Sequence, residues 1–314
     1  MITGEKINWI EGTPLGVNIR EIEYIAPHVH NDIVEITLCL SGEIKMSYCF
    51  EEFTLSPGDF ILVDKDTHYL YDGKDAVCAS FYIDLKYFEE KYPYINHLYF
   101  VCEGTPGSSV PYNTENHKQL KGILLAILLF MLETTEGEAG FNQKITEGCN
   151  NVIDIIMNKF DIIFFYEPQL EITEKSLMRC RLIMDYIFRH QQENITVGDL
   201  AREFGLSEAY ITEFLKKYFL GFRKMVAFTR LCHAETLLLY TDMNILQISE
   251  ACNFSDPKYL YETFDFWYEC TPNQFRKKYS KEMGNESRVK ELHIDDVITP
   301  VVKMTRKHFM DTFL

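Results

Sequence analysis

The chain has 314 residues, of which 46% are hydrophobic and 25% are charged, and these values exclude a disordered or low-complexity protein. Its formal net charge of −16 at pH 7 also argues against uniform electrostatic attraction to a polyanion. The acidic excess is uneven, because residues 176–281 contain 14 basic and 13 acidic side chains and are close to neutral. We therefore expect at least two parts with different roles.

The cysteines and apolar runs indicate the cellular setting. Nine cysteines occur without a CxxC pair, and most lie in expected strands and helices rather than in a loop-rich framework. We interpret them as reduced, buried thiols of a cytoplasmic protein. The N-terminal stretch MITGEKINWIEG lacks the basic and apolar regions of a signal peptide, so none is expected. The longest apolar run, 122–132, is too short to cross a bilayer, and no membrane partner is expected.

Within the first expected domain, residues 1–112, the stretch from 15 to about 84 alternates apolar and polar side chains as strands do. Strands are expected at 34–40, 45–50, 59–64 and 76–84. Turn signals separate them at Ser41-Gly42, at Ser56-Pro57-Gly58 and at Asp72-Gly73. Short strands at this spacing predict a small antiparallel barrel or sandwich.

Two helices with wide apolar faces are expected next, at about 115–134 and 142–165, in a helical segment that spans 113–168. They serve either as a packing layer on the barrel or as a dimerisation hairpin. A linker at 167–173 precedes a helix-rich domain at 176–281. The tail, 282–314, carries the pattern of a short amphipathic helix between Val301 and Met310, and its sequence indicates no role.

Two stretches of the helix-rich domain repeat each other 48 positions apart. Each begins with a capping-box-like pair, Thr196 with Asp199 and Asn244 with Gln247. The matched residues are Val197, Leu200, Ala201, Gly205, Leu206 and Ser207 in the first stretch, and Ile245, Ile248, Ser249, Asn253, Phe254 and Ser255 in the second.

This repeat is typical of a helix–turn–helix. Two short helices cross closely and need a small residue at the crossing, and the turn needs a residue that tolerates a left-handed backbone. A serine then caps the second helix, which in DNA-binding proteins of this kind enters the major groove. These three roles fall on Ala201, Gly205 and Ser207 in the first unit and on Ser249, Asn253 and Ser255 in the second.

Over residues 178–279 the chain resembles the AraC/XylS family of bacterial transcription regulators. The resemblance rests on ITVGDLAREFGLSEAYI (195–211), on TRLCHAETLLLYTDMNILQISEACNFSD (229–256) and on the closing CTPNQFRKKY (270–279). It implies a C-terminal all-α domain, 176–281, whose two helix–turn–helix units bind double-stranded DNA.

The resemblance also implies which residues face DNA. Base-facing positions fall on Ala209, Thr212 and Glu213 in the first unit and on Pro257, Lys258, Tyr261 and Glu262 in the second. Phosphate contacts are expected from Lys216, Lys217, Arg223, Lys224 and Lys258, each of which can instead belong to a solvated helix face. Ser207, Glu208 and Ser255 complete the candidate interface.

The sequence departs from its relatives within this interface. Glu213 and Glu262 stand where a basic residue is usual, Asp265 replaces a usual Lys, and Gly221 is displaced from its usual place. Acidic side chains that face DNA repel phosphates, although a Glu can accept a hydrogen bond from cytosine N4. We therefore expect weak, strongly salt-dependent DNA binding.

A second resemblance lies in residues 1–112. His28-x-His30, then Glu35 and Gly42, then Pro57-Gly58-Asp59 and His68 are similar to the cupin pattern, and AraC-type regulators often carry such a sensor domain. The expected fold class is thus α+β multidomain: a cupin-like antiparallel β-barrel with a helical hairpin, followed by the all-α domain. The stretch from Gly58 to His68 is one residue shorter than in metal-binding cupins.

The cupin-like residues have three alternative uses. His28, His30, Glu35 and His68 can form a divalent-metal site, although no cofactor is required by the sequence. They can instead line a pocket for an organic ligand in the barrel mouth, or they can be structural histidines. The aromatic residues expected near the pocket are Tyr24, Tyr48, Tyr69, Phe81 and Tyr82.

These observations predict a ligand-responsive, sequence-specific transcriptional regulator, an activator and not an enzyme. Its expected partners are promoter DNA, a small-molecule effector, a second copy of the chain and RNA polymerase. Two alternatives are a metal-dependent cupin enzyme with an appended helical domain, and a family member with impaired DNA binding that acts through protein contacts. The sequence does not identify the effector, the target genes or the operator.

Overall fold

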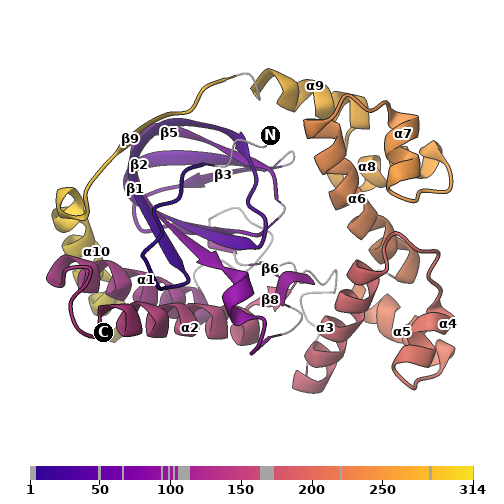
Figure 1. Ribbon diagram of the computed structural model, residues 1–314, viewed down its shortest axis with the longest axis horizontal. Coiled ribbons are helices and arrows are strands. Elements are labelled where there is room, and N and C mark those ends of the chain that lie inside the picture. The colour runs from indigo at the N-terminus through magenta and orange to yellow at the C-terminus, as the bar shows by residue number, and fades with distance from the viewer. Residues whose placement is uncertain are drawn as a thin grey trace. The chain divides into compact units, whose positions relative to one another are not determined.

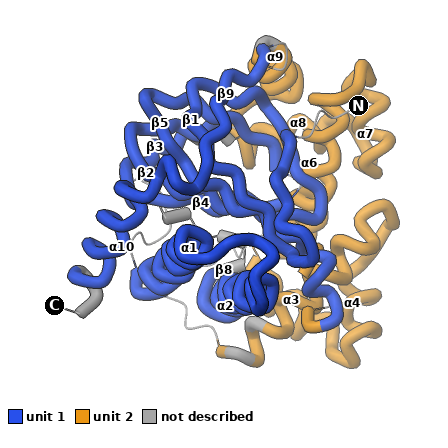
Figure 2. The backbone as a smooth tube through the Cα atoms, turned by 60° about the vertical axis from the view of Figure 1, so that its left-hand side comes forward, with its two compact units in different colours: residues 1–90, 100–162, 283–314 blue, residues 91–99, 163–282 orange. Residues whose placement is uncertain are grey.

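The computed structural model describes residues 5–48, 51–65, 67–92, 95–97, 100–101, 103–104, 114–162, 173–219, 221–282 and 285–313. The chain divides into two compact units (Figure 2). Unit 1 contains residues 1–90, 100–162 and 283–314, and unit 2 contains residues 91–99 and 163–282. The sheet, the expected helical segment and the tail therefore lie together in unit 1.

Unit 1 is built around an antiparallel sheet of seven strands, ordered β7-β4-β2-β5-β1-β9, with β3 also paired to β2. The sheet curls around its own core (Figure 1), and among the described strands β7 and β9 form its two edges. The predicted antiparallel β-fold followed by a helical region is confirmed. The strands are β1 (Leu15–His28), β2 (Ile33–Tyr48), β3 (Glu51–Leu55), β4 (Phe60–Val63), β5 (Tyr69–Asp84), β7 (Glu103–Gly104) and β9 (Arg288–Glu291).

Two expected turns are wrong, because β2 and β5 each run without a break through the turn signal. The ladder between them shifts register around Ser41, where Gly42 adopts a left-handed φ of +74°. A Cβ on Gly42 would lie 2.0 Å from the carbonyl oxygen of Asp75, so only glycine fits this approach. Ser41-Gly42 and Asp72-Gly73 thus mark irregularities inside long strands, which let the sheet bend without ending a strand.

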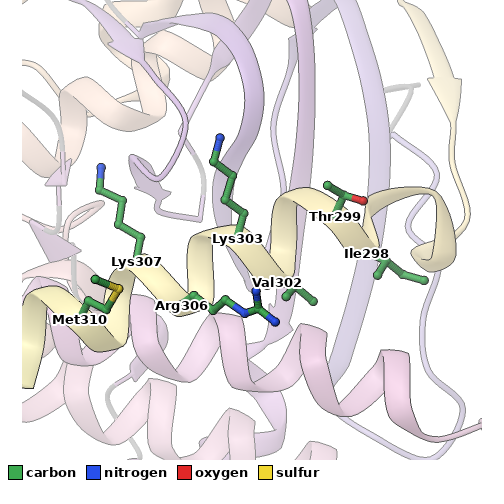
Figure 3. A pocket seen from close by; sticks show the side chains of 7 residues that line it. All are labelled: Ile298, Thr299, Val302, Lys303, Arg306, Lys307 and Met310. Carbon is green, nitrogen blue, oxygen red and sulfur yellow. The ribbon is translucent and has the colours of Figure 1, made fainter.

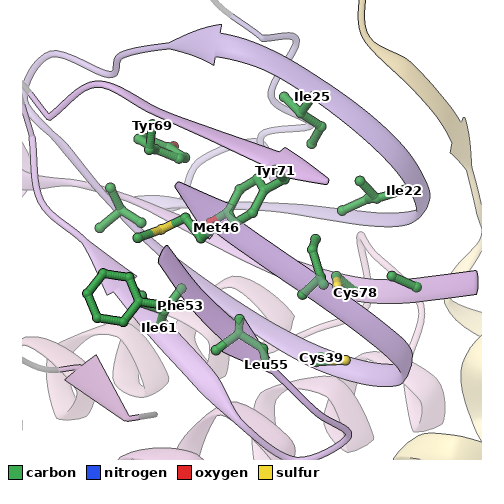
Figure 4. Packing of buried hydrophobic residues seen from close by; sticks show 13 residues of the cluster. Ile22, Ile25, Cys39, Met46, Phe53, Leu55, Ile61, Tyr69, Tyr71 and Cys78 are labelled. Atoms are coloured by element: carbon green, nitrogen blue, oxygen red, sulfur yellow. The ribbon is translucent and has the colours of Figure 1, made fainter. Parts of the chain in front are cut away.

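The core of unit 1 lies inside the curl of the sheet. Buried side chains from β1, β2, β3, β4 and β5 meet there (Figure 4). The strands alternate so that one face supplies this apolar cluster. Its members are Ile22, Ile25, Cys39, Ile44, Met46, Phe53, Leu55, Ile61, Val63, Tyr69, Tyr71, Ala76 and Cys78.

Two helices follow the sheet, α1 (Glu115–Glu133) and α2 (Phe141–Lys159), and they pack against each other. The helix predicted at 142–165 is too long, because it ends at Lys159 and Asp161–Ile162 form strand β8 beside β6 (Phe100–Val101). Two short 3-10 helices, η1 (Leu85–Phe88) and η2 (Ile95–His97), lie between the sheet and α1 in the chain. Residues 105–113 and most of the expected linker at 167–173 lie outside the described residues.

The tail returns to unit 1. Strand β9 pairs with β1, η3 (Ile294–Val297) follows, and α10 (Ile298–Phe313) packs against α1. The predicted amphipathic helix exists and is longer than expected, whereas β9 was not predicted. One side of α10 bears a surface hollow of about 530 Å³ in which Lys303, Arg306 and Lys307 alternate with apolar side chains (Figure 3). No described helix is both long and apolar enough to cross a membrane.

Unit 2 is helical. Its elements are α3 (Glu174–Arg189), α4 (Val197–Glu203), α5 (Glu208–Phe219), α6 (Phe222–Tyr240), α7 (Ile245–Ala251), α8 (Pro257–Tyr268) and α9 (Pro272–Glu282). Helix α6 contacts α5 on one side and α7, α8 and α9 on the other, so it joins the two halves of the unit. Its buried face includes Leu231, Ala234 and Leu238.

A carboxyl group is buried in this helical core. Glu235 of α6 is 4% exposed, and its Oε2 accepts a hydrogen bond from the Tyr268 hydroxyl at 2.7 Å. Burial raises the pKa of Glu235 to about 8, and the hydrogen bond from Tyr268 opposes this shift only in part. The folded state therefore holds Glu235 protonated at neutral pH.

We predict that unit 2 loses stability as the pH rises from about 4.5 to about 8, because the folded state binds a proton in this window that the unfolded state releases. The slope should reach about 1.4 kcal/mol per pH unit. Glu235→Gln keeps the acceptor for Tyr268 and should abolish this slope. Thermal unfolding followed by Trp267 fluorescence, in a Trp9→Phe background, reports unit 2 alone, since the chain has two tryptophans. Parallel pH profiles for wild type and variant would refute the prediction.

Candidate functional site

The two halves of unit 2 begin with the same cap. In α4 the Thr196 hydroxyl accepts from the Asp199 amide at 3.2 Å, and the Asp199 carboxylate accepts from the Thr196 amide at 2.8 Å. In α7 the Asn244 side chain accepts from the Gln247 amide at 3.0 Å, and the Gln247 side chain accepts in return at 2.9 Å. Both predicted capping boxes are confirmed, and each fixes the first residue of its helix.

The two turns are also the same. Gly205 and Asn253 hold left-handed φ values of +61° and +56°. After each of them, a backbone amide donates back across the turn at 2.9 Å, from Leu206 to the Ala201 carbonyl and from Phe254 to the Ser249 carbonyl. The small residues at the crossing are therefore tied directly to the turn, as the repeat predicts.

The two second helices begin differently. The Ser207 hydroxyl accepts from the Tyr210 amide at 3.2 Å, so it caps α5 as expected. Ser255 does not cap α8: the cap is Asp256, whose carboxylate accepts from the Lys258 amide at 2.7 Å, with Pro257 at the first helical position. An Asp directly before an N1 proline explains the shift by one residue.

Two arginines that belong to the family-like motifs, and whose contacts were not predicted, connect the parts of these helix–turn–helix units. Arg230 donates to the carbonyls of Gln191 and Glu193, at 3.0 and 2.9 Å, just before the cap of α4. Arg276 donates to the carbonyls of Leu238 and Met243, at 2.8 and 2.7 Å, just before the cap of α7. In each helix–turn–helix unit, one arginine guanidinium thus donates hydrogen bonds to backbone carbonyls of the segment that leads into the first helix.

Helices α5 and α8 carry the candidate nucleic-acid interface. On α5 its residues recur at a spacing of four, which places them on one face of the helix. None of the candidate residues of unit 2 is buried. Those on or beside α5 are Ser207, Glu208, Ala209, Thr212, Glu213, Lys216 and Lys217; those at the start of α6 are Arg223 and Lys224; those on or beside α8 are Ser255, Pro257, Lys258, Tyr261 and Glu262.

Several of the candidate cations already have partners. Lys216 pairs with Glu213 at 2.8 Å, and Lys258 pairs with Glu262 at 3.5 Å. The Lys224 ammonium lies 3.9 Å from the centre of the Phe266 ring. Exposed pairs of this kind contribute about 0–1 kcal/mol, so a phosphate can displace either glutamate at little cost.

Unit 1 contains a buried polar site centred on Glu35, which is 1% exposed. Its carboxylate accepts from the Thr37 hydroxyl at 2.6 Å, from the Tyr71 hydroxyl at 3.2 Å and from the Tyr69 hydroxyl. The His30 Nε2 lies 3.4 Å from Glu35 Oε2, without hydrogen-bond geometry. Burial tends to raise the pKa of Glu35, but the neighbouring His30, His28 and Thr37 outweigh it and hold the pKa at about 2.

His28 directs its Nε2 atom, which has no hydrogen-bond partner, towards the same carboxylate. Its Nδ1 lies 2.9 Å from the carbonyl oxygen of Ala26, which can only accept, so Nδ1 carries the proton. Burial lowers the pKa of His28 to about 4, which keeps the ring neutral. The Nε2 lone pair then points at Glu5 Oε2, 3.6 Å away, and at Glu35 Oε2, 4.0 Å away, with no hydrogen-bond partner.

The structure brings together only part of the predicted pocket. His28, His30, Glu35, Tyr69 and Tyr82 converge, with Tyr82 stacked edge-on against His30 at 5.2 Å between ring centres. The group able to hold a metal consists of Glu5, His28, His30 and Glu35. His68 is fully buried and is not part of this group; burial lowers its pKa to about 3, and the nearby His28 contributes to the shift.

The other predicted pocket residues lie elsewhere. Tyr24 lies under the guanidinium of Arg288, 5.3 Å from its ring centre. Phe81 is fully buried and, next to Tyr82 on β5, points to the opposite face of the strand. The side chain of Tyr48 lies outside the described residues.

Four residues of the site were missed. Thr37 and Tyr71 stand two positions from Glu35 and Tyr69, so strand alternation could have placed them on the same face. Glu5 and Arg20 gave no local signal, because Glu5 precedes the first strand and Arg20 reads as an ordinary exposed strand residue. Arg20 is nevertheless 3% exposed and pairs with Glu5.

Comparison with known proteins identifies the helical region. Residues 200–278 match a family described as a helix-turn-helix domain. The chain carries an AraC-type helix-turn-helix domain. Over 254 residues, 79% of its length, it is 24% identical to an uncharacterized HTH-type transcriptional regulator of Staphylococcus aureus strain MRSA252, of which it spans 30%. Over 124 residues it is 28% identical to a similarly named regulator of Escherichia coli K12, covering 39% of this chain and 44% of that protein.

Solved structures similar to the chain include ToxT of Vibrio cholerae O395 and the DNA-binding domain of AdpA in complex with a target DNA. ToxT matches 85% of this chain and 98% of its own at 14% identity, with a TM-score of 0.40. The AdpA domain matches 32% of this chain and 91% of its own at 20% identity, with a TM-score of 0.29.

Within the AraC-type domain, Glu262 offers a direct test of the recognition face. Glu262→Arg removes a negative charge, frees Lys258 and adds a cation on α8. If α8 faces DNA, non-specific affinity should rise, and the slope of log K against log salt should steepen by about 1 for each phosphate gained. Fluorescence anisotropy with a random duplex at several salt concentrations measures both quantities.

The matched control is Glu250→Arg, which makes the same charge change at an exposed position of α7, the first helix of the same module. It should change the salt slope less than Glu262→Arg does. Equal slopes in both variants, or no change in either, would show that α8 does not face DNA.

Proposed function

We propose that this protein is a sequence-specific, DNA-binding transcriptional regulator. The observation that carries the proposal is the duplicated helix–turn–helix unit: the first helices, α4 and α7, start from matched capping boxes, and after matched turns the second helices, α5 and α8, present exposed side chains at helical spacing. Two such helices can read two successive segments of major groove from one chain. The AraC-type domain match and the HTH-type regulators among its relatives support this assignment.

The local charge suits a regulator that binds reversibly. Residues 176–281 carry a net charge of +1, so few phosphate contacts are available and the sequence-independent part of DNA affinity is low. In this proposal Lys258 and Lys216 exchange their glutamate partners for phosphates, and Tyr261 and Thr212 read base edges. The protein acts on promoter DNA in the cytoplasm, as an activator that contacts RNA polymerase.

We further propose that the buried site of unit 1 makes the regulator ligand-responsive. Glu35 and the two histidines beside it form a polar cluster in an otherwise apolar interior, an arrangement typical of a binding site. A ligand there changes DNA binding only if it favours one arrangement of the chain over another. Unit 1 is also the part we propose to form a homodimer, and no catalytic step is assigned to it.

One observation favours the alternative of a family member with impaired DNA binding. Helices α5 and α8 each contain a lysine that pairs with a glutamate three or four residues away. These pairs reduce the positive electrostatic potential that attracts DNA phosphates. The two functions differ in one measurement, sequence-selective protection of DNA by the intact chain.

We expect the intact protein to protect two adjacent major-groove segments in the region upstream of its own gene when footprinted at low salt. Lys258→Gln should weaken binding to all sequences alike and reduce the salt slope by about 1, whereas Tyr261→Ala should mainly reduce the preference for specific over random DNA. Lys303→Gln, on α10 of unit 1, is the control and should change neither. Absence of any protected base at low and moderate salt would reject DNA reading and favour action through protein contacts.

A further inference from the structure

We infer that Glu5, His28, His30 and Glu35 form a divalent-cation site, and that Arg20 couples this site to the docking of the C-terminal strand β9. The inference deepens the proposed function, because it names the class of ligand that unit 1 senses and the element that responds. It differs from the ligand set implied by the cupin resemblance, since Glu5 from the N-terminal segment is included and His68 is not.

The four residues offer a ready set of donor atoms. One ligand atom from each lies within 4.8 Å of all the others, and His28, His30 and Glu35 are at least 94% buried. Two imidazole nitrogens and two carboxylates suit a first-row ion such as Mn²⁺, Fe²⁺ or Zn²⁺, whereas Ca²⁺ and Mg²⁺ prefer oxygen ligands alone. The donor chemistry therefore points to a transition-metal ion.

The electrostatics of the site call for a cation. The Nε2 atoms of His28 and His30 are buried and have no hydrogen-bond partner. The Nε2 of His28 lies 3.6 Å from Glu5 Oε2 and 4.0 Å from Glu35 Oε2, and the Nε2 of His30 lies 3.4 Å from Glu35 Oε2. Buried polar atoms without a partner are costly. A cation between these atoms would give each of them a partner.

Glu5 connects the site to Arg20. Its Oε2 faces His28 and accepts from the Tyr82 hydroxyl at 3.0 Å, while its Oε1 pairs with the Arg20 guanidinium. Arg20 also donates to the Lys6 carbonyl at 2.8 Å, so the same guanidinium holds the segment that carries Glu5. Its Nε lies 2.5 Å from the carboxylate of Glu291, the last residue of β9.

Beyond its backbone ladder with β1, strand β9 is held by charged side chains. All four of its residues are exposed, so its docking buries little apolar area. Two of its ion pairs, Arg288 with Glu23 and Lys290 with Glu21, are exposed on both sides and contribute little. In the pair between Arg20 and Glu291, by contrast, the Arg20 side chain is only 4% exposed. Among the ion pairs of β9, the pair with Arg20 is therefore the one that connects the strand to the buried site.

These contacts form one series of alternating positive and negative charges, which runs from the cation through Glu5 and Arg20 to Glu291. A bound cation fixes Glu5, Glu5 fixes Arg20, and Arg20 then holds Glu291, so cation binding and β9 docking favour each other. By linkage, weakening either end weakens the other by the same factor. Helix α9, the last of the AraC-type domain, ends at Glu282 and β9 begins at Arg288, so β9 anchors the chain that leaves the DNA-binding unit.

The test uses the full chain, stripped of metal and titrated with Mn²⁺ by calorimetry and by electron paramagnetic resonance. Glu5→Gln should weaken Mn²⁺ binding at least about tenfold, as expected for loss of a ligand. Glu291→Gln, which contacts no ion, should weaken binding by about tenfold through Arg20. Lys290→Gln removes a neighbouring exposed pair on the same strand and should leave the affinity unchanged.

Hydrogen exchange of the peptide containing β9 supplies the second readout. Mn²⁺ should slow its exchange severalfold in wild type and in Lys290→Gln, but not in Glu291→Gln. The coupling is overturned if Mn²⁺ binds wild type and leaves β9 exchange unchanged, or if Glu291→Gln and Lys290→Gln respond alike. Absence of binding by Mn²⁺, Fe²⁺ and Zn²⁺ overturns the cation site itself. Footprinting of the metal-free protein is scored separately, so DNA reading can survive either failure.

Discussion

A buried charge must be surrounded by partners, and this constraint organises unit 1. Glu35 lies on β2 in the middle of the sheet, where an isolated carboxylate would be costly. The hydroxyls of Thr37, Tyr69 and Tyr71 turn towards it from β2 and β5. Arg20 meets the same requirement on β1 by gathering Glu5 and Glu291 from opposite ends of the chain. The polar interior thus decides where three distant segments meet.

In unit 2 the equivalent constraint acts on backbone carbonyls. A helix–turn–helix joins short helices through loops whose polar groups cannot all pair with one another. Capping boxes satisfy the amides at each helix start, and the forks of Arg230 and Arg276 satisfy the carbonyls just upstream. Rigid loops of this kind hold α5 and α8 in defined directions, which a pair of reading helices requires. The acidic residues on these helices are exposed and do not disturb this frame.

Local patterns in the sequence specify most of the fold. The capping pairs, the left-handed residues Gly205 and Asn253 and the strand alternation depend on near neighbours, so they could be read directly. The wrong predictions arose at positions where the local sequence is compatible with two structures. Gly42 suits a turn or a bulge, and only the length of the partner strand decides between them. Asp256 competes with Ser255 as a cap because both precede the same proline.

The candidate site of unit 1 was half predictable for a related reason. His28, His30 and Glu35 stand close together in sequence, at the end of β1, in the loop that follows it and on β2, so a motif could assemble them. Glu5, Arg20 and Glu291 are joined by contacts that span up to 271 positions, and no sequence spacing encodes such a pairing. The notion of His68 as a fourth ligand rested on resemblance, whereas the arrangement of the strands places Glu5 in the group instead.

The return of the tail to the sheet makes residues 163–282 of unit 2 an insertion between two portions of unit 1. During synthesis the nascent sheet lacks its edge strand until the ribosome has produced residue 291, long after the helices of unit 2 have emerged. Pairing between β1 and β9 is therefore a late and highly non-local step of folding. An unpaired strand edge invites association with other chains while it waits. The edge between β1 and β9 is lined by charged residues: Glu21, Glu23, Arg288 and Lys290. Before β9 is synthesised, the charges on β1 disfavour pairing of this open edge with a strand of another chain.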